Sequence, residues 1–278
     1  MRGGMFLAAA SLGLSGMAQA ATVDLNDWSA ESYPAVSGFG AGVWNPVLDG
    51  SSVTQTVNGQ PTIYYSDFDA YGTKVTGTIQ VLSGAGDDDF VGFVIGYNGG
   101  DTTNSAADYL LVDWKRISQS FNFGAPSSTP GGNAPAGLAV SRVSGIPTAD
   151  EFWQHVDYLD DAGGGLAELQ RGATLGGTGW NFGVDYEFSF DFGPNNLEVF
   201  VDGVKQIDIA GSFSNGSLGF YNFSQQNVRY SAFTTEDGSF PDPNPAIPEP
   251  ATWAMMIGGF ALAGGSLRRR RVTANFAA

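Results

Sequence analysis

Three consecutive carboxylates, Asp87, Asp88 and Asp89, are the residues whose types and spacing point most directly to chemistry. Like charges this close repel one another, so the cluster costs stability unless water or a cation neutralises it. Ca²⁺ suits such a cluster because it takes several oxygen ligands in flexible geometry. The spacing that starts at Asp87 does not follow an EF-hand loop, so a solvated acidic turn remains the alternative.

Other oxygen-bearing side chains could complete a calcium shell around the triplet. They lie on both sides of it in the sequence: Asp67 and Asp69 upstream, and Asn98, Asp101 and Asp108 downstream. Ca²⁺ takes six to eight oxygen ligands, so the triplet alone would leave positions for these groups or for water.

Few other catalytic groups are present. The chain of 278 residues has no Cys and one His, which excludes a thiol nucleophile, a Cys-ligated zinc and a His-rich metal site. His155 could enter a Ser-His-Asp arrangement, but it lies close to Trp153 on one short expected helix. Glu187 and Asp191 share a face of an expected strand, as the two carboxylates of a glycosidase could. A secreted polysaccharide-active enzyme is therefore the alternative to a non-enzymatic protein.

Aromatic residues invite a carbohydrate interpretation, although most should fill the core of a β protein. Trp180 follows the Gly-rich stretch 176–179. We expect it to be the exposed aromatic side chain best placed to stack on a sugar ring.

The elements that must position these residues are strands. Alternating apolar and polar residues, and short β-branched or aromatic runs, predict roughly eleven strands with turn residues between them. They cover residues 52–57, 62–65, 74–82, 90–97, 109–114, 138–143, 186–192, 197–201, 204–209, 217–222 and 228–233. Asp202-Gly203 predicts a tight hairpin, and residues 149–158, with Thr148 as the cap, form the one expected helix. This pattern predicts an all-β sandwich or barrel over residues 21–238.

The first 20 residues have the composition of a secretory signal peptide. Arg2 precedes the apolar stretch Met5–Met17, and Ala18-Gln19-Ala20 is a small-residue cleavage site. We expect the mature protein to begin at Ala21 and to be exported.

The C-terminal end has three parts in a fixed order. A Pro-rich linker, residues 239–247, precedes Pro248-Glu249-Pro250, and an apolar run over 251–267 follows. The run is long enough for a short transmembrane helix, and its flanking arginines predict a cytoplasmic end. These arginines are Arg268, Arg269, Arg270 and Arg271.

Residues 248–271 resemble the PEP-CTERM sorting signal of Gram-negative bacteria. The resemblance implies transient anchoring in the inner membrane, recognition by an exosortase, and delivery to the cell surface or an extracellular polysaccharide matrix. An ordinary tail anchor is the alternative.

The net charge of −16 argues against a nucleic-acid partner. The two ends hold five of the 12 basic residues and one of the 28 acidic residues. The body therefore carries 27 acidic against 7 basic residues, which is more acidic than the whole chain suggests.

The triplet and its surroundings resemble the thrombospondin C-terminal domain. The resemblance spans residues 44–235 and is carried by four stretches: Asp87–Tyr97, Asp108–Lys115, Leu138–Val140 and Gly216–Gln226. It implies a concanavalin A-like jelly-roll sandwich, with Asp87, Asp88 and Asp89 as calcium ligands and a role in cell–matrix adhesion. The chain contains no Arg-Gly-Asp tripeptide, so attachment to animal-type receptors is not expected. We therefore expect an exported, calcium-binding, non-enzymatic surface or matrix protein for adhesion or exopolysaccharide binding.

Overall fold

The computed structural model describes residues 20–124, 131–158 and 163–240, together with the single residues 242, 257 and 260. The chain divides into two units, Met1–Asp242 and Pro243–Ala278. The predicted signal peptide and nearly all of the predicted C-terminal helix lie outside the described residues. The description below concerns the first unit.

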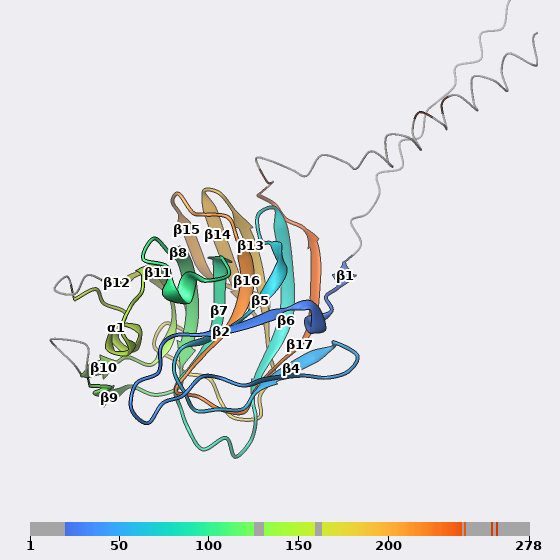
Figure 1. Cartoon of the computed structure of the whole chain (residues 1–278). Coiled ribbons are helices and arrows are strands. Elements are labelled where there is room, and N and C mark those ends of the chain that lie inside the picture. The colour runs from blue at the N-terminus through green and yellow to red at the C-terminus, as the bar shows by residue number, and fades with distance from the viewer. Residues whose placement is uncertain are drawn as a thin grey trace, which may run out of the picture. The chain divides into compact units, whose positions relative to one another are not determined.

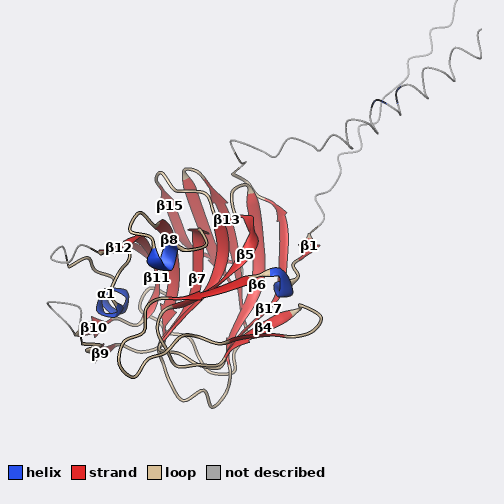
Figure 2. Cartoon of the chain, in the orientation of Figure 1, coloured by secondary structure: helices blue, strands red, loops and turns tan. Residues whose placement is uncertain are grey.

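The first unit is built from two antiparallel sheets, whose strands run side by side in Figures 1 and 2. The eight-stranded sheet has the order β15 (Val204–Ala210), β14 (Asn196–Val201), β13 (Tyr186–Gly193), β6 (Thr73–Val81), β17 (Val228–Asp237), β4 (Ser52–Gln55), β3 (Trp44–Pro46), and β1 (Ala21–Thr22) pairs with β17. The seven-stranded sheet has the order β12 (Gly164–Arg171), β11 (Gly137–Gly145), β8 (Asp108–Lys115), β7 (Phe90–Tyr97), β16 (Ser217–Phe223), β5 (Thr62–Asp69), β2 (Ser29–Ser32). This architecture confirms the predicted all-β sandwich.

The seven-stranded sheet has two buried faces of different character. Its inner face packs against the eight-stranded sheet, and Phe93 of β7 contacts Phe188 and Phe190 of β13 there. Its outer face carries a second apolar cluster, which includes Phe90 and Phe152. Strand β7 is buried along its whole length because both of its faces are covered. The sequence of a strand that is covered on both faces is typically a continuous apolar run, and residues 90–97 have this pattern.

Three elements cover the outer face: the small sheet of β9 (Gln119–Phe121) and β10 (Gly132–Ala134), the helix α1 (Ala149–Gln154), and residues 33–39. Figure 1 shows α1 beside β9 and β10. Thr148 and Glu151 form the predicted capping box at the start of α1. The helix is shorter than predicted because His155 adopts a left-handed conformation (φ 54°) that ends it.

The eleven predicted strands correspond to β4–β8, β11 and β13–β17. The hairpin at Asp202-Gly203 is also confirmed, because both residues have positive φ, at 50° and 74°. Sequence reasoning missed the short strands β1, β2, β3, β9 and β10, and it missed β12. β12 has no alternating burial pattern, so its sequence carried no period-2 signal.

Candidate calcium site

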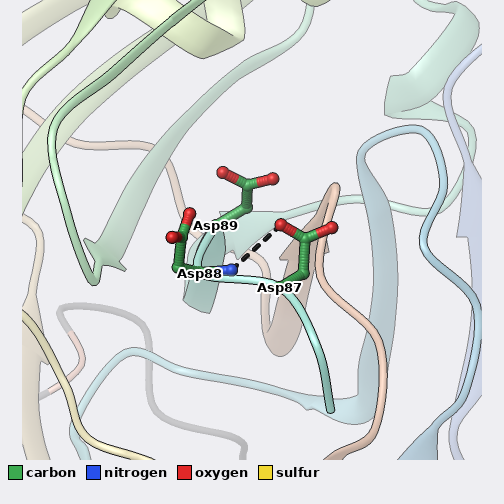
Figure 3. Close-up of side chains that lie close together, drawn as sticks. All are labelled: Asp87, Asp88 and Asp89. Carbon is green, nitrogen blue, oxygen red and sulfur yellow. Dashed lines mark hydrogen bonds between the residues drawn. The ribbon is translucent and has the colours of Figure 1, made fainter.

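The acidic triplet lies in the connection between β6 and β7, immediately before Phe90 begins β7. Gly86, with φ at 80°, turns the chain just ahead of it. One carboxylate oxygen from each of Asp87, Asp88 and Asp89 lies within 4.8 Å of the others. The three predicted ligands therefore lie close enough together to share one cation, as Figure 3 shows.

Asp89 is the inner member of the triplet and already has a protein cation beside it. Its side chain is buried, and one carboxylate oxygen is bonded to Nζ of Lys115, which is also fully buried. Its backbone N–H donates to the side-chain oxygen of Gln225 at 2.9 Å. Burial raises the pKa of the Asp89 carboxyl to about 6, and the Lys115 ammonium opposes this shift. The Asp89 carboxylate thus already has Lys115 as its ion-pair partner in the absence of a metal ion.

Lys115 is held in a deep position by its own neighbours. Its ammonium group donates to the side-chain oxygen of Gln119 at 3.2 Å. It also lies 4.2 Å from the ring centre of Trp153 and 5.2 Å from that of Phe90, close enough for cation–π attraction. A buried ion pair needs such additional contacts, because both charges have lost their water.

Asp87 and Asp88 are the outer members of the triplet. Asp87 accepts a hydrogen bond from the amide nitrogen of Asn58, and its other oxygen accepts from the backbone N–H of Asp88 at 3.0 Å (Figure 3). Ser224 donates to the side-chain oxygen of Asn58 at 3.3 Å, which fixes how the Asn58 amide is turned. Within the described ranges, no protein cation pairs with the carboxylate of Asp87 or Asp88.

These two outer carboxylates line an open cavity of ≈350 Å³, together with Ser83, Gly84, Gly86, Arg116 and Phe182. Asp89 does not line it. The guanidinium of Arg116 lies 4.7 Å from the ring centre of Phe182, so the aromatic ring holds this cation at the cavity wall. Two unneutralised carboxylates facing an open cavity suit a hard divalent cation whose remaining ligands are water.

The side chains expected to complete the shell lie elsewhere. The triplet precedes the eight-residue strand β7, whereas Asn98 and Asp101 follow it, so roughly 26 Å of extended chain separates them. Asp108 lies at that same far end and forms an ion pair with Arg142. Asp67 and Asp69 are also placed there, because Asp69 pairs with Ser217, which in turn pairs with Tyr97. The side chain that reaches the outer carboxylate of Asp87 is Asn58, which no local sequence signal marked.

Trp180 is not the exposed sugar platform that the sequence suggested. Its side chain is 1% exposed, and its indole N–H donates to the backbone carbonyls of Asp89 and Trp114, each at 3.1 Å. A buried indole N–H needs such an acceptor, because an unpaired buried donor costs free energy. Trp180 therefore supports the triplet from inside the sandwich.

His155 occupies a buried position between two carboxylates. Nε2 lies 3.0 Å from Asp113 and Nδ1 lies 3.3 Å from Glu168. Burial alone would lower the pKa of His155, but the two carboxylates overcome it and raise the pKa to about 9. The same contact holds the pKa of Glu168 down at about 2. His155 is thus a protonated link between the end of α1 and the sheet.

Of the two carboxylates considered for glycoside hydrolysis, Asp191 has a structural partner. Asp191 accepts two hydrogen bonds from the backbone N–H of Ser239, at 3.0 and 2.9 Å. Glu187 is exposed, and its backbone N–H donates to Asp202. Neither carboxylate lines the cavity at the triplet.

Family comparison now places the chain. The family model described as the thrombospondin C-terminal region matches residues 41–237. The chain belongs to this family. Its acidic triplet, the neighbouring strand that ends in Lys115 and the final strand β17 all fall within the matched range.

Curated relatives are thrombospondins of much greater length. Thrombospondin-3b of Danio rerio is 25% identical over 199 residues, which cover 68% of this chain and 20% of the relative. Thrombospondin-2 of Mus musculus is 27% identical over 192 residues, which cover 66% of this chain and 15% of the relative. The chain therefore spans a fifth or less of the length of these relatives.

Solved structures show weak overall likeness. The carbohydrate-binding module CBM66 from Bacillus subtilis has a TM-score of 0.45 at 11% identity and covers 72% of this chain and 99% of its own. The exoplasmic domain of VIP36 in its Ca²⁺/Man3GlcNAc-bound form has a TM-score of 0.42 at 10% identity and covers 82% and 88%. Likeness at this level does not identify a ligand for this chain.

The C-terminal end matches the PEP-CTERM protein-sorting motif over residues 246–271, which include Pro248-Glu249-Pro250 and the four arginines from Arg268 to Arg271. This motif marks the chain for export and exosortase sorting. In the part of the chain that the structure describes, no helix is long and apolar enough to cross a membrane. The predicted transmembrane helix falls on residues outside that part, apart from Ile257 and Phe260.

Proposed function

We propose that this chain is an exported, calcium-binding, non-enzymatic protein of the cell surface or matrix, and that it serves adhesion or exopolysaccharide binding. The observation that carries the proposal is the pair of outer carboxylates, Asp87 and Asp88, which line an open cavity and form no ion pair with a side chain of the described ranges. Ca²⁺ would be held by these two groups and water, with Asp89 behind them. The sorting motif supports the location, because an exported protein meets far more free Ca²⁺ than a cytosolic one.

Thermal melting with and without Ca²⁺ tests the calcium part. A ligand at 100 times its Kd stabilises the native state by about 2.7 kcal/mol, which should raise the melting temperature by roughly 5–10 °C in a domain of this size. Asp88→Asn should remove most of this shift, because it removes charge from the cavity and keeps the side-chain size. Asp67→Asn is the matched control, since Asp67 is an exposed carboxylate at the opposite end of β7.

The calcium proposal fails if EDTA and Ca²⁺ produce the same melting curve. It also fails if Asp88→Asn and Asp67→Asn retain equal shifts. Either result would favour the solvated acidic turn that the sequence left as the alternative.

A glycan array with and without Ca²⁺ tests the binding part. We expect retention on at least one class of extracellular polysaccharide. An assay for reducing-sugar release should remain negative with every glycan that binds, because Asp191, one of the two carboxylates suited to hydrolysis, is held by the backbone N–H of Ser239. Sustained release of reducing ends would replace this proposal with the alternative of a polysaccharide-active enzyme.

A further inference from the structure

A second cavity, of ≈580 Å³, opens over the outer face of the seven-stranded sheet. Its wall comes from segments that are far apart in the sequence: residues 33–37 after β2, Gln60 and Pro61 before β5, Phe123 and Gly124 after β9, and residues 146–149 with Phe152 around the start of α1. None of these residues takes part in the acidic triplet. The cavity is therefore a separate site.

The described wall of this cavity carries no Asp, Glu, Lys, Arg or His, although the chain as a whole has a net charge of −16. Val36, Phe123, Ile146 and Phe152 contribute apolar surface. A charged ligand would lose its hydration there without gaining a partner. The ligand group that enters must be neutral and largely apolar.

One polar group in the wall lacks a partner. Gln60 is 2% exposed, and its amide nitrogen has no hydrogen-bond acceptor among the described residues. Buried donors in native proteins are nearly always paired, since an unpaired one costs free energy. An ordered water could pair with it, but the cavity has the size of a small-molecule site and far exceeds the ~30 Å³ of one water. The ligand should therefore carry an acceptor.

We propose that this cavity binds the acyl group of a neutral, acylated sugar. The acyl carbonyl accepts a hydrogen bond from the Gln60 amide, and its alkyl part packs against Val36 and Ile146, which line the cavity and are partly exposed. An unsubstituted sugar fits less well, because its many hydroxyl groups need several polar partners, whereas the described wall is largely apolar and carries no charged side chain. This inference rests on the proposed polysaccharide-binding function and specifies the chemical class of the polysaccharide.

Isothermal titration of the full chain tests the inference with two matched probes. The first is a mixture of acetylated xylo-oligosaccharides, and the second is the same mixture after mild alkaline deacetylation, so that both are neutral. We expect the acetylated mixture to bind about tenfold more tightly, the equivalent of one net hydrogen bond. Gln60→Met should erase this preference, because it keeps the side-chain length and removes the donor.

A substitution at the rim separates binding from folding. Ala35 is exposed and lines the cavity, so Ala35→Trp should fill the entrance without disturbing the core and should abolish binding of the acetylated mixture. Ala106→Trp is the matched control at an exposed position outside the cavity and should bind as the wild type does.

Equal affinity for the two mixtures overturns the inference, as does unchanged binding by Ala35→Trp. Failure to bind either mixture overturns it too. The melting shift with Ca²⁺ tests the calcium site independently of this cavity, because Asp88 does not line the cavity. A chain that responds to Ca²⁺ but does not prefer the acetylated mixture would contradict the acyl site and support the calcium site. A chain that prefers the acetylated mixture but does not respond to Ca²⁺ would support the acyl site and contradict the calcium site.

Discussion

The two faces of the seven-stranded sheet are both buried, yet they are stabilised in different ways. On the inner face, β8 contributes Leu110, Val112 and Trp114 to the apolar core between the sheets. On the outer face, the alternate positions of the same strand include Asp113 and Lys115, which are buried and form ion pairs with His155 and Asp89. One strand thus supplies only apolar side chains to the inner interface, whereas on the outer side it adds two charged residues to the apolar Tyr109 and Leu111.

The difference explains why the outer face needs its cover. Ionised side chains in the interior are tolerated only when a partner of opposite charge lies beside them. His155, which follows helix α1, reaches Asp113, while the loop before β7 provides Asp89, which reaches Lys115. The ion pair with Lys115 therefore ties Asp89 of the triplet to the outer face, whereas the inner face carries the larger apolar cluster.

The largest expected effect comes from the inner face. Phe93→Ala should lower the free energy of unfolding by about 3–5 kcal/mol, because it removes a fully buried ring from a dense aromatic cluster. Chemical denaturation at pH 6 and at pH 9 should give the same loss. A loss that varied strongly with pH would mean that the inner face, too, depends on ionisation.

The next effect comes from the buried ion pair of the outer face. Lys115→Met should cost about 3 kcal/mol, because it leaves the Asp89 carboxylate buried without its cation. The double variant Lys115→Met with Asp89→Leu should recover most of the loss in the same denaturation assay, since neither charge is then stranded. If the double variant is no more stable than the single one, packing and not charge dominates at this position.

The smallest effect is a pH dependence that belongs to His155. Its pKa in the folded protein is about 9, above the ordinary value of 6.5, so the protonated form is favoured by folding. The stability that it contributes, on the order of 2–3 kcal/mol, should be complete below pH 6.5 and lost as the pH rises through 9.

His155→Gln tests this assignment. The variant should lack the decline in unfolding free energy between pH 6.5 and pH 9 that the wild type shows, while Phe93→Ala should keep it. A decline that persists in His155→Gln would place the pH-sensitive group elsewhere on the outer face.

The elements of the fold were largely predictable because their signals are local. Strands such as β7 and β13 are predicted by their apolar runs or by alternating apolar and polar residues. The capping box at Thr148 and Glu151 marks the start of α1. The short edge strands and β12 were not predictable, since their pairing depends on a neighbouring strand and not on their own pattern.

The candidate site was predictable in part. Asp87, Asp88 and Asp89 are adjacent in sequence, so their proximity needs no fold. Asn58 reaches them from 29 residues away, and Trp180 reaches the carbonyl of Asp89 from 91 residues away. Contacts of this length depend on strand order, which local patterns do not encode.

The sequence by itself determined that this is an exported all-β protein with a sorting motif at its end and a concentrated negative charge before one buried strand. Those properties follow from the overall composition, from the two-residue alternation of the strands and from short motifs. None of these signals depends on contacts between distant residues. Only the tertiary structure decided which carboxylates of the triplet face solvent. Their burial and pairing depend on contacts with segments that are far away in the sequence. It separated Asp87 and Asp88 in their open cavity from Asp89 beside Lys115, and it placed Trp180 in the core.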